Sequence, residues 1–321
     1  MQLTKQIEQT DIEPHMSALR GWLRGNIVGM YAGPKRKNGH KTDQCSVVFH
    51  VQHKKSADRI ALDGDEAIPP FLELPIAQNG GKPVMVKVPT DVQEVGPFRD
   101  DAEPVAKPEP MASWDRIRPA PGGQQVQPQG INMAGTLGAS FNINGQYRML
   151  SNNHVLSYNG QYTRIYQPDV SQQQNYLCDV SGFINLITYP NSNQFNPIYN
   201  TTDLAWCNTT PLVCSPAING IGTPVGFAAP AANMQVSCYG ATTDEVMHTS
   251  IVSVHYQGVM RIMGQYAWFQ DAIWLNGDNF APLPGDSGSI LVNNQLQMVG
   301  ILTATNVFGA MACLIPTQLI H

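Results

Sequence analysis

The sequence predicts a mainly β protein, with two small barrels preceded by a small α+β unit. From Ile131 onward, short apolar runs alternate with Gly and Asn turns, as an all-β double barrel requires. Ahead of these runs lies a stretch rich in Pro and Gly, and ahead of that a helical pattern and three strand-like runs. The 321 residues are enough for two or three compact units with sizeable cores.

Residues 1–100 form the predicted N-terminal α+β accessory domain. The segment from Gln6 to Arg24 carries apolar residues at roughly helical spacing, with Pro14 bounding or interrupting the helix. The strand-like runs that follow are residues 26–31, 45–53 and 84–95. The middle run alternates apolar with polar or small residues, which is typical of a half-buried strand. We expect a small α+β unit here and not a third barrel.

Residues 101–130 form a predicted Pro/Gly-rich connector, because they show no apolar periodicity. A connector of this kind can wrap across a barrel or hold a processing site, and the sequence leaves both possibilities open. The double-barrel domain is predicted over residues 131–321, with barrel one at about 131–215 and barrel two at about 225–321.

Composition and charge exclude several classes of function. The formal net charge of −5 argues against a nucleic-acid partner, since phosphate binding needs a concentrated basic face. No apolar run reaches membrane-spanning length, and the opening residues lack the apolar core of a secretory signal, so we expect a cytoplasmic protein with no membrane partner. Six cysteines without a Cys-x-x-Cys pair predict free thiols, and no zinc-type ligand spacing is present. We therefore expect neither a metal nor a cofactor.

The most informative stretch is Gly-Asp-Ser-Gly at residues 285–288, followed by an apolar strand. The two glycines allow a sharp turn that presents Ser287 at a strand mouth. In that geometry the N–H groups of Gly285 and Ser287 point into one small space, as donors to a developing oxyanion do. A tight turn before a buried strand is the alternative interpretation. A serine hydroxyl is a weak nucleophile at neutral pH, so the motif needs a base and an orienting acid.

A candidate base and a candidate acid precede the serine in order. His154 ends a polar turn in the run 150–156, and Asp203 begins the run Asp-Leu-Ala. The separations, 203 − 154 = 49 and 287 − 203 = 84 residues, suit two barrels with the first pair on one and the nucleophile on the other. By role, Ser287 attacks a carbonyl, His154 takes and returns its proton, and Asp203 holds the imidazole tautomer and stabilises its charged form.

These three motifs, Leu-Ser-Asn-Asn-His-Val-Leu, Asp-Leu-Ala and Gly-Asp-Ser-Gly, resemble the catalytic motifs of the trypsin-like serine proteases. Residues 116–123 and 135–138 are similar to a bacterial branch in which an N-terminal domain precedes the barrels, related in layout to plant narrow-leaf-type proteases. The resemblance implies a chymotrypsin-like fold and a serine endopeptidase that works through an acyl-enzyme. Ser289 in place of a second glycine and Trp206 in place of a small aliphatic residue depart from the digestive relatives, but neither removes a catalytic group.

Ile27-Val28-Gly29 resembles the new N-terminus that activates the zymogens of digestive relatives. In those relatives a few tens of residues separate it from the catalytic histidine, whereas here the gap is 154 − 27 = 127 residues. We expect an ordinary strand at this point, whose amine does not pair with Asp286.

Substrate preference follows from the resemblance as well. Ala281 stands six positions before the serine, where relatives that cut after basic residues carry an acid. The strand edge that pairs with substrate backbone and flanks the primary pocket is expected at Thr303, Ala304 and Thr305. An uncharged pocket favours a small or apolar residue before the cut, because a buried Lys or Arg lacks a counter-charge. Entry of Arg261 or Asp271 into the pocket is the alternative.

Two other functions stay open beside a serine endopeptidase. One is a catalytically silent or latent trypsin-like scaffold that acts as a binding module. The other is a serine hydrolase that acts on esters or on its own chain, for instance on the connector. Strand edges in the N-terminal domain also predict a homo-oligomer that assembles through this domain.

Overall fold

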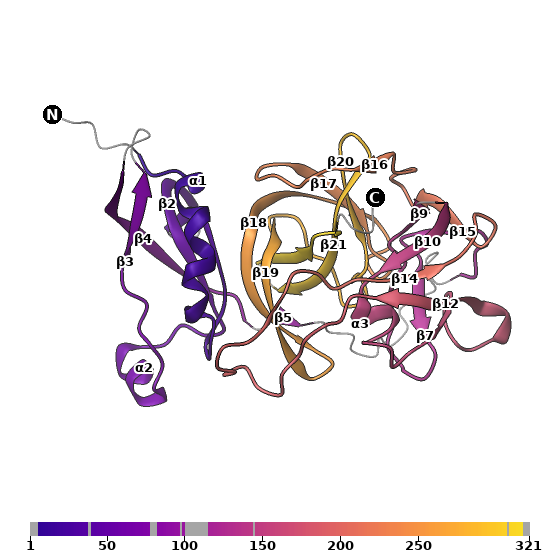
Figure 1. Ribbon diagram of the computed structural model, residues 1–321, viewed down its shortest axis with the longest axis horizontal. Coiled ribbons are helices and arrows are strands. Elements are labelled where there is room, and N and C mark those ends of the chain that lie inside the picture. Colours follow the sequence, from indigo (N-terminus) through magenta and orange to yellow (C-terminus); the bar gives the residue numbers. More distant parts are fainter. Residues whose placement is uncertain are drawn as a thin grey trace.

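The computed structural model describes residues 6–37, 40–77, 82–96, 98–99, 115–143, 145–306 and 308–316. Within them, strand accounts for 49% and helix for 10%, so the predicted mainly β class is confirmed. Figure 1 shows the N-terminal strands and helices on one side and the β domain on the other. Residues 101–114 of the predicted connector lie outside the described residues.

The N-terminal unit combines short helices with four strands. Its elements are α1 (Gln9–Ile12), the 3₁₀ helix η1 (Glu13–Trp22), β1 (Ile27–Lys37), β2 (His40–Val51), α2 (Ala57–Asp63), β3 (Phe71–Ala77) and β4 (Pro83–Glu94). β1, β2 and β4 correspond to the three predicted runs, whereas α2 and β3 were not predicted. The expected single helix is an α turn followed by 3₁₀ helix, with Pro14 near the start of the latter. Proline lacks the N–H that an uninterrupted α-helix would need at this point.

Barrel two is a closed ring of six strands. Its strands are β17 (Gln235–Tyr239), β18 (Val246–Ile262), β19 (Gln265–Asn276), β20 (Ile290–Asn293), β21 (Gln297–Asn306) and β22 (Gly309–Cys313), with β16 (Gly226–Phe227) beside β21. Hydrogen-bonded pairs run in the order β17-β18-β19-β22-β21-β20 and return to β17. Closure leaves no free sheet edge around the ring.

The first half of the domain is a sheet of seven strands in the order β8-β7-β11-β12-β14-β10-β9. Their bounds are β7 (Gln125–Pro128), β8 (Gly135–Thr136), β9 (Ala139–Ile143), β10 (Gln146–Ser151), β11 (Arg164–Tyr166), β12 (Tyr176–Phe183) and β14 (Ala205–Asn208). Smaller elements are β6 (Ala120–Gly122), α3 (Asn153–Leu156), η3 (Gln173–Asn175), β13 (Tyr199–Asn200) and β15 (Cys214–Ile218). β6 and β7 lie at residues that were expected in the connector.

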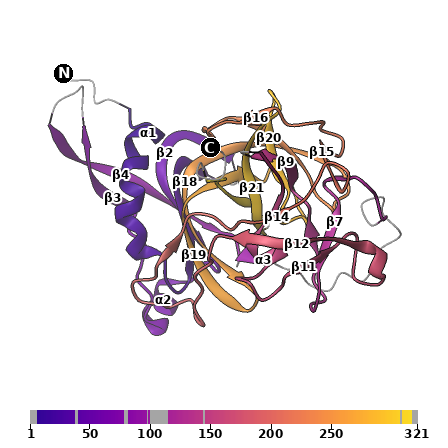
Figure 2. The same cartoon turned by 45° about the vertical axis from the view of Figure 1, so that its right-hand side comes forward.

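The N-terminal unit is joined to barrel two through a continuous sheet. β1 pairs with β18 in the register Gly29↔Gly258 and Met30↔Gln257, so β1, β2, β4 and β3 extend the barrel sheet (Figures 1 and 2). Glycine is required at position 29, because a Cβ there would lie 1.8 Å from the Tyr256 hydroxyl. One apolar core contains Met30 of β1 and Trp268 of β19 together. Each part therefore buries apolar surface of the other.

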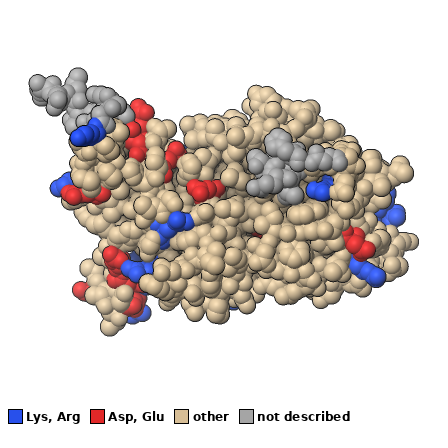
Figure 3. Space-filling model, in the orientation of Figure 1, with Lys and Arg blue, Asp and Glu red and all other residues tan. Residues whose placement is uncertain are grey.

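Charged side chains are sparse on the β domain. In the face shown in Figure 3, Lys, Arg, Asp and Glu gather more over the N-terminal unit than over the barrels. Across the described ranges, no helix combines the length and apolar character that a membrane crossing demands.

His50 of β2 lies at the junction between the two parts and is fully buried. Its Nδ1 is 3.0 Å from the Tyr256 hydroxyl of β18, and its ring is 4.9 Å from that of Trp274 and 5.4 Å from that of Tyr31. Burial, with a smaller contribution from the charge of Arg36, lowers the pKa of His50 to about 3. The neutral imidazole is thus the form that the fold accommodates.

We predict that acid destabilises the protein through His50. The unfolded chain binds a proton at this residue below pH 6.5, whereas the folded chain does so only near pH 3. Stability is therefore retained above pH 6.5 and lost between these values, by about 2 kcal/mol on going down to about pH 5. Urea unfolding of the unaltered chain and His50→Gln at about pH 7 and about pH 5 measures the difference. The exposed His40→Gln is the control, and an equal acid loss in His50→Gln would refute the assignment.

Candidate active site

The three side chains predicted to be catalytic, those of His154, Asp203 and Ser287, lie in three separate segments of the chain. His154 is the second residue of α3, which directly follows β10. Asp203 lies just ahead of β14, the strand that pairs with β10. Ser287 lies in the loop between β19 and β20 of barrel two. The histidine and the aspartate therefore come from the seven-stranded sheet and the serine from barrel two, as the spacing predicts.

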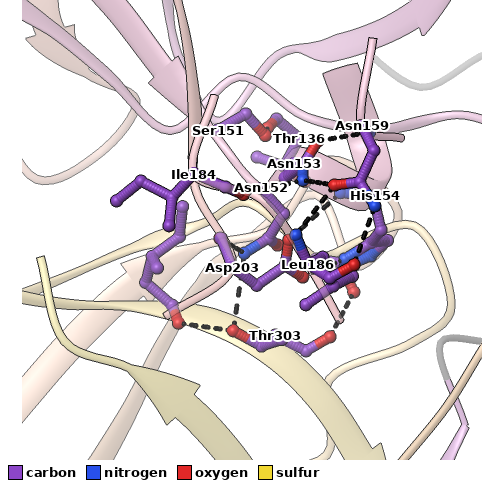
Figure 4. Close-up of polar contacts among 12 residues, drawn as sticks. Thr136, Ser151, Asn152, Asn153, His154, Asn159, Ile184, Leu186, Asp203 and Thr303 are labelled. Atoms are coloured by element: carbon purple, nitrogen blue, oxygen red, sulfur yellow. Dashed lines mark hydrogen bonds and ion pairs between the residues drawn. The ribbon is translucent and has the colours of Figure 1, made fainter. Parts of the chain in front are cut away.

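His154 and Asp203 make two contacts with each other (Figure 4). The ring Nδ1 of His154 is hydrogen-bonded to Oδ2 of Asp203, and the His154 backbone N–H donates to Oδ1 at 3.1 Å. The Asp203 side chain is fully buried, and that of His154 is 2% exposed. A carboxylate at Nδ1 favours the tautomer with its proton on that nitrogen, which makes Nε2 the basic one. The pair is thus oriented for proton transfer at Nε2.

Two asparagines before the histidine hold its turn in place (Figure 4). The Asn152 side-chain amide donates to the Asp203 carbonyl at 2.9 Å and to Thr303 Oγ1 at 3.4 Å. The Asn153 amide donates to the Ile184 carbonyl at 2.9 Å and to Asn159 Oδ1 at 2.7 Å. The sequence indicated only a polar turn here, and the sole signal that it offered for such a network was the pair of consecutive asparagines.

One pocket brings Ser287, His154 and Gly285 together. It is lined by Pro128, Ile131, Met133, Ala134, His154, Val155, Gly285 and Ser287. Five of these were not predicted as site residues, and four of those five come from the segment between β7 and β8, or its edges, where no motif marked them. The pocket therefore offers apolar walls beside the serine and the histidine.

The two backbone N–H groups predicted to form an oxyanion site belong to Gly285 and Ser287, in the loop that carries the serine. Within the part of the chain that the structure describes, neither the N–H of Gly285 nor that of Ser287 donates a hydrogen bond. Gly285 has φ +97°, a conformation that favours glycine. The Ser287 hydroxyl donates to the Thr303 carbonyl at 3.1 Å.

Thr136 of β8 fixes the serine loop to the seven-stranded sheet. Its N–H donates to the Ser287 carbonyl at 2.8 Å, and its hydroxyl donates to the Gly285 carbonyl at 2.8 Å. The same hydroxyl accepts the N–H of Ala241 at 3.0 Å. These contacts cross between the two halves of the domain, so sequence reasoning, which worked from local motifs, missed Thr136.

Asp286, beside the serine, is fully buried, and its carboxylate accepts four hydrogen bonds. Backbone N–H groups of Thr242, Thr243 and Leu283 donate at 2.8, 3.0 and 2.8 Å, and the Thr243 hydroxyl donates as well. Burial raises the pKa of Asp286, while these donors oppose the rise. Ile27 is the first residue of β1, an ordinary strand as expected. The hydrogen-bond donors to the Asp286 carboxylate are Thr242, Thr243 and Leu283 of barrel two.

The four residues expected at the primary pocket do not line the pocket just described, although the Thr303 carbonyl contacts the Ser287 hydroxyl. Ala281 is solvent-exposed, Thr303 and Ala304 are buried within β21, and Thr305 is half-buried. None of the four is among the described residues that line the pocket at Ser287. Of the alternatives, Arg261 is exposed on β18 and Asp271 is 3.1 Å from His255 Nδ1. The described residues also contain no cluster of His, Cys, Asp or Glu able to hold a metal ion.

Comparison with known proteins gives one family match. The family model described as Trypsin matches residues 120–313. Among solved structures, Thermobifida fusca protease A is 18% identical with a TM-score of 0.42, covering 62% of this chain and 93% of its own. Cellulomonas bogoriensis chymotrypsin is 17% identical with a TM-score of 0.40, covering 61% and 91%. No curated protein matches the sequence. The family to which the chain belongs is therefore assigned from the match to the family model.

We predict that Thr243→Val destabilises the fold by about 1.5–3 kcal/mol, because it removes a hydrogen bond to a buried carboxylate. Thr243→Ser, which keeps the hydroxyl, is the matched control and is expected to remain close to the unaltered chain. Denaturant unfolding at neutral pH measures both variants. Equal stability of the valine and serine variants would show that the hydroxyl does not hold Asp286.

Proposed function

The chain belongs to the trypsin family of serine proteases, and we propose that it is a serine endopeptidase that works through Ser287, His154 and Asp203. The observation that carries the proposal is the pocket shared by Ser287 and His154, with His154 fixed from behind by the buried Asp203. A nucleophile beside a base that a third group orients is the arrangement that acyl transfer needs.

The proposed reaction uses the groups in the order that their positions suggest. The Ser287 hydroxyl, which donates to the Thr303 carbonyl, turns about χ1 toward His154. His154 takes its proton as the oxygen attacks the substrate carbonyl, and Asp203 stabilises the imidazolium that forms. The N–H groups of Gly285 and Ser287 donate hydrogen bonds to the oxyanion. His154 then gives the proton to the leaving amine, and water releases the acyl group from Ser287 by the same steps.

We propose cleavage after small or apolar residues. Ala281 brings no charge to the predicted position, and the buried Thr303 and Ala304 supply no carboxylate either. A buried Lys or Arg of a substrate would therefore lack a counter-charge, which makes its desolvation unfavourable.

The finer relationship is also a proposal. Residues 116–123 and 135–138 favour the bacterial branch that carries an N-terminal domain and shares its layout with plant narrow-leaf-type proteases. An accessory unit joined to β18 is compatible with that layout. Assembly of several copies through this unit remains a prediction as well.

We predict that a fluorophosphonate probe adds once to the unaltered chain and not to Ser287→Ala, because only an activated serine reacts with it. His154→Ala loses the base and is expected to remain unlabelled on the same timescale. Asp203→Asn is expected to label more slowly by up to about 10⁴-fold, because it favours the wrong imidazole tautomer. Intact mass after timed exposure measures all four proteins.

Circular dichroism and thermal unfolding serve as the folding controls for these variants. A folded, unaltered chain that takes up no adduct would contradict a self-sufficient protease and favour the latent or binding scaffold. Labelling of Ser287→Ala at the same rate would place the reactive group elsewhere.

We predict at least about tenfold higher kcat/KM for peptides with Ala, Val or Leu before the cut than for matched peptides with Lys or Arg. The measurement is a set of fluorogenic peptides that differ at this one residue. Ser287→Ala is the control for contaminating proteases. Equal or faster cleavage after Lys or Arg would point to an acidic group in the pocket, with Asp271 the first to substitute.

A further inference from the structure

A two-residue strand of this chain lies on the edge where substrate is expected to bind. β5 (Phe98–Arg99) follows the N-terminal unit and pairs with two strands of barrel two (Figure 1). It is parallel to β18, with Met260↔Phe98 and Arg261↔Arg99, and antiparallel to β21, with Thr305↔Arg99.

The contact between Ser287 and Thr303 locates the substrate edge on β21. Because the Ser287 hydroxyl is 3.1 Å from the Thr303 carbonyl, a peptide bond under attack at Ser287 lies beside Thr303. A substrate in extended conformation advances about 3.3 Å per residue, as β21 itself does, so the two pair residue by residue. Thr305 is 305 − 303 = 2 positions further along. Thr305 therefore faces the third substrate residue before the cut, counting the residue beside Thr303 as the first.

β5 occupies this place in the direction a substrate would take. Its antiparallel register means that the chain at Arg99 runs from Thr305 toward Thr303, and so toward Ser287. Thr305 also pairs with Ala310 of β22 on its other side. A strand has two edges, and at Thr305 a neighbouring strand lies along each of them. An extended substrate can reach Thr305 only if β5 leaves.

We propose that β5 is a built-in competitive inhibitor of the protease, which covers the substrate edge at Thr305. The proposal rests on the proposed function. β5 is tethered through β4, β2 and β1 to β18, so its effective concentration at the edge is on the order of mM. Because β5 pairs through only two residues, an extended substrate can displace it. β5 therefore lowers the cleavage rate of extended peptides without closing the site. Substrates that reach only Ser287 and its pocket avoid the competition.

The test compares a variant that removes backbone donors with one that changes side chains only. Phe98→Pro/Arg99→Pro removes both N–H groups of β5, and successive N–H groups point to opposite edges of a strand. We expect kcat/KM for a tetrapeptide substrate to rise at least about tenfold, while the rate of fluorophosphonate labelling stays unchanged. Phe98→Ala/Arg99→Ala, which keeps the backbone donors, is the matched control and is expected to resemble the unaltered chain.

Each other outcome has a separate meaning. Unchanged tetrapeptide cleavage in a proline variant that labels normally would overturn the inhibitor and leave the protease standing. A rise of equal size in the alanine variant would overturn backbone pairing as its cause. Absence of labelling in every protein would overturn the proposed function and the inhibitor with it.

A second measurement serves if the proline variant does not fold. On the unaltered chain, lengthening a substrate from one residue to three before the cut is expected to leave kcat/KM nearly constant, because Thr305 is covered. A large gain on reaching the third residue would show that the edge is free, and would overturn the proposal.

Discussion

The candidate site depends on the hydrogen bonds of Thr136, which tie the two halves of the domain together at the serine loop. One buried residue contacts the carbonyls of Gly285 and Ser287, accepts from Ala241, and through its own carbonyl accepts from Ser151 at 2.6 Å. Ser151 stands at the end of β10, directly before the turn that carries His154. The relative position of His154 and Ser287 is therefore set by short links through one strand end, and not only by the packing of two sheets.

The serine loop is held from its other side by Asp286. Placing a carboxylate in a fully buried position is costly unless its oxygens are satisfied, and here four donors of barrel two satisfy them. The residue before Ser287 is thereby fixed by its neighbours in barrel two. Such an arrangement favours a serine loop that is formed without a new N-terminal amine at Asp286.

Local motifs carried most of what could be predicted about the site, because His154, Asp203 and Ser287 each sit in a recognisable turn and their order fits two sheets. Thr136 and Thr243 could not be found in this way. Their partners lie 149 and 43 residues away, and single threonines have no pattern that marks them. In the fold, alternation and turns predicted β1, β2 and β4. The pairing of β18 with β1 places Gly29 against Tyr256, a contact between distant segments that no local pattern marks.

The shared sheet gives the N-terminal unit a different role from that of a tethered accessory domain. β1 hydrogen-bonds to β18, and its apolar face joins a core that includes Val259 and Trp268 of barrel two. The Trp268 indole N–H donates to the Leu23 carbonyl at 3.2 Å, which adds a polar contact to that core. Separation would expose this apolar surface and the edge of β18 together, so the unit is expected to stay attached under native conditions. Because β5 follows directly from this attached unit, it always stays close to β21. The strength of its few hydrogen bonds then determines how often the edge of β21 at Thr305 is free for a substrate.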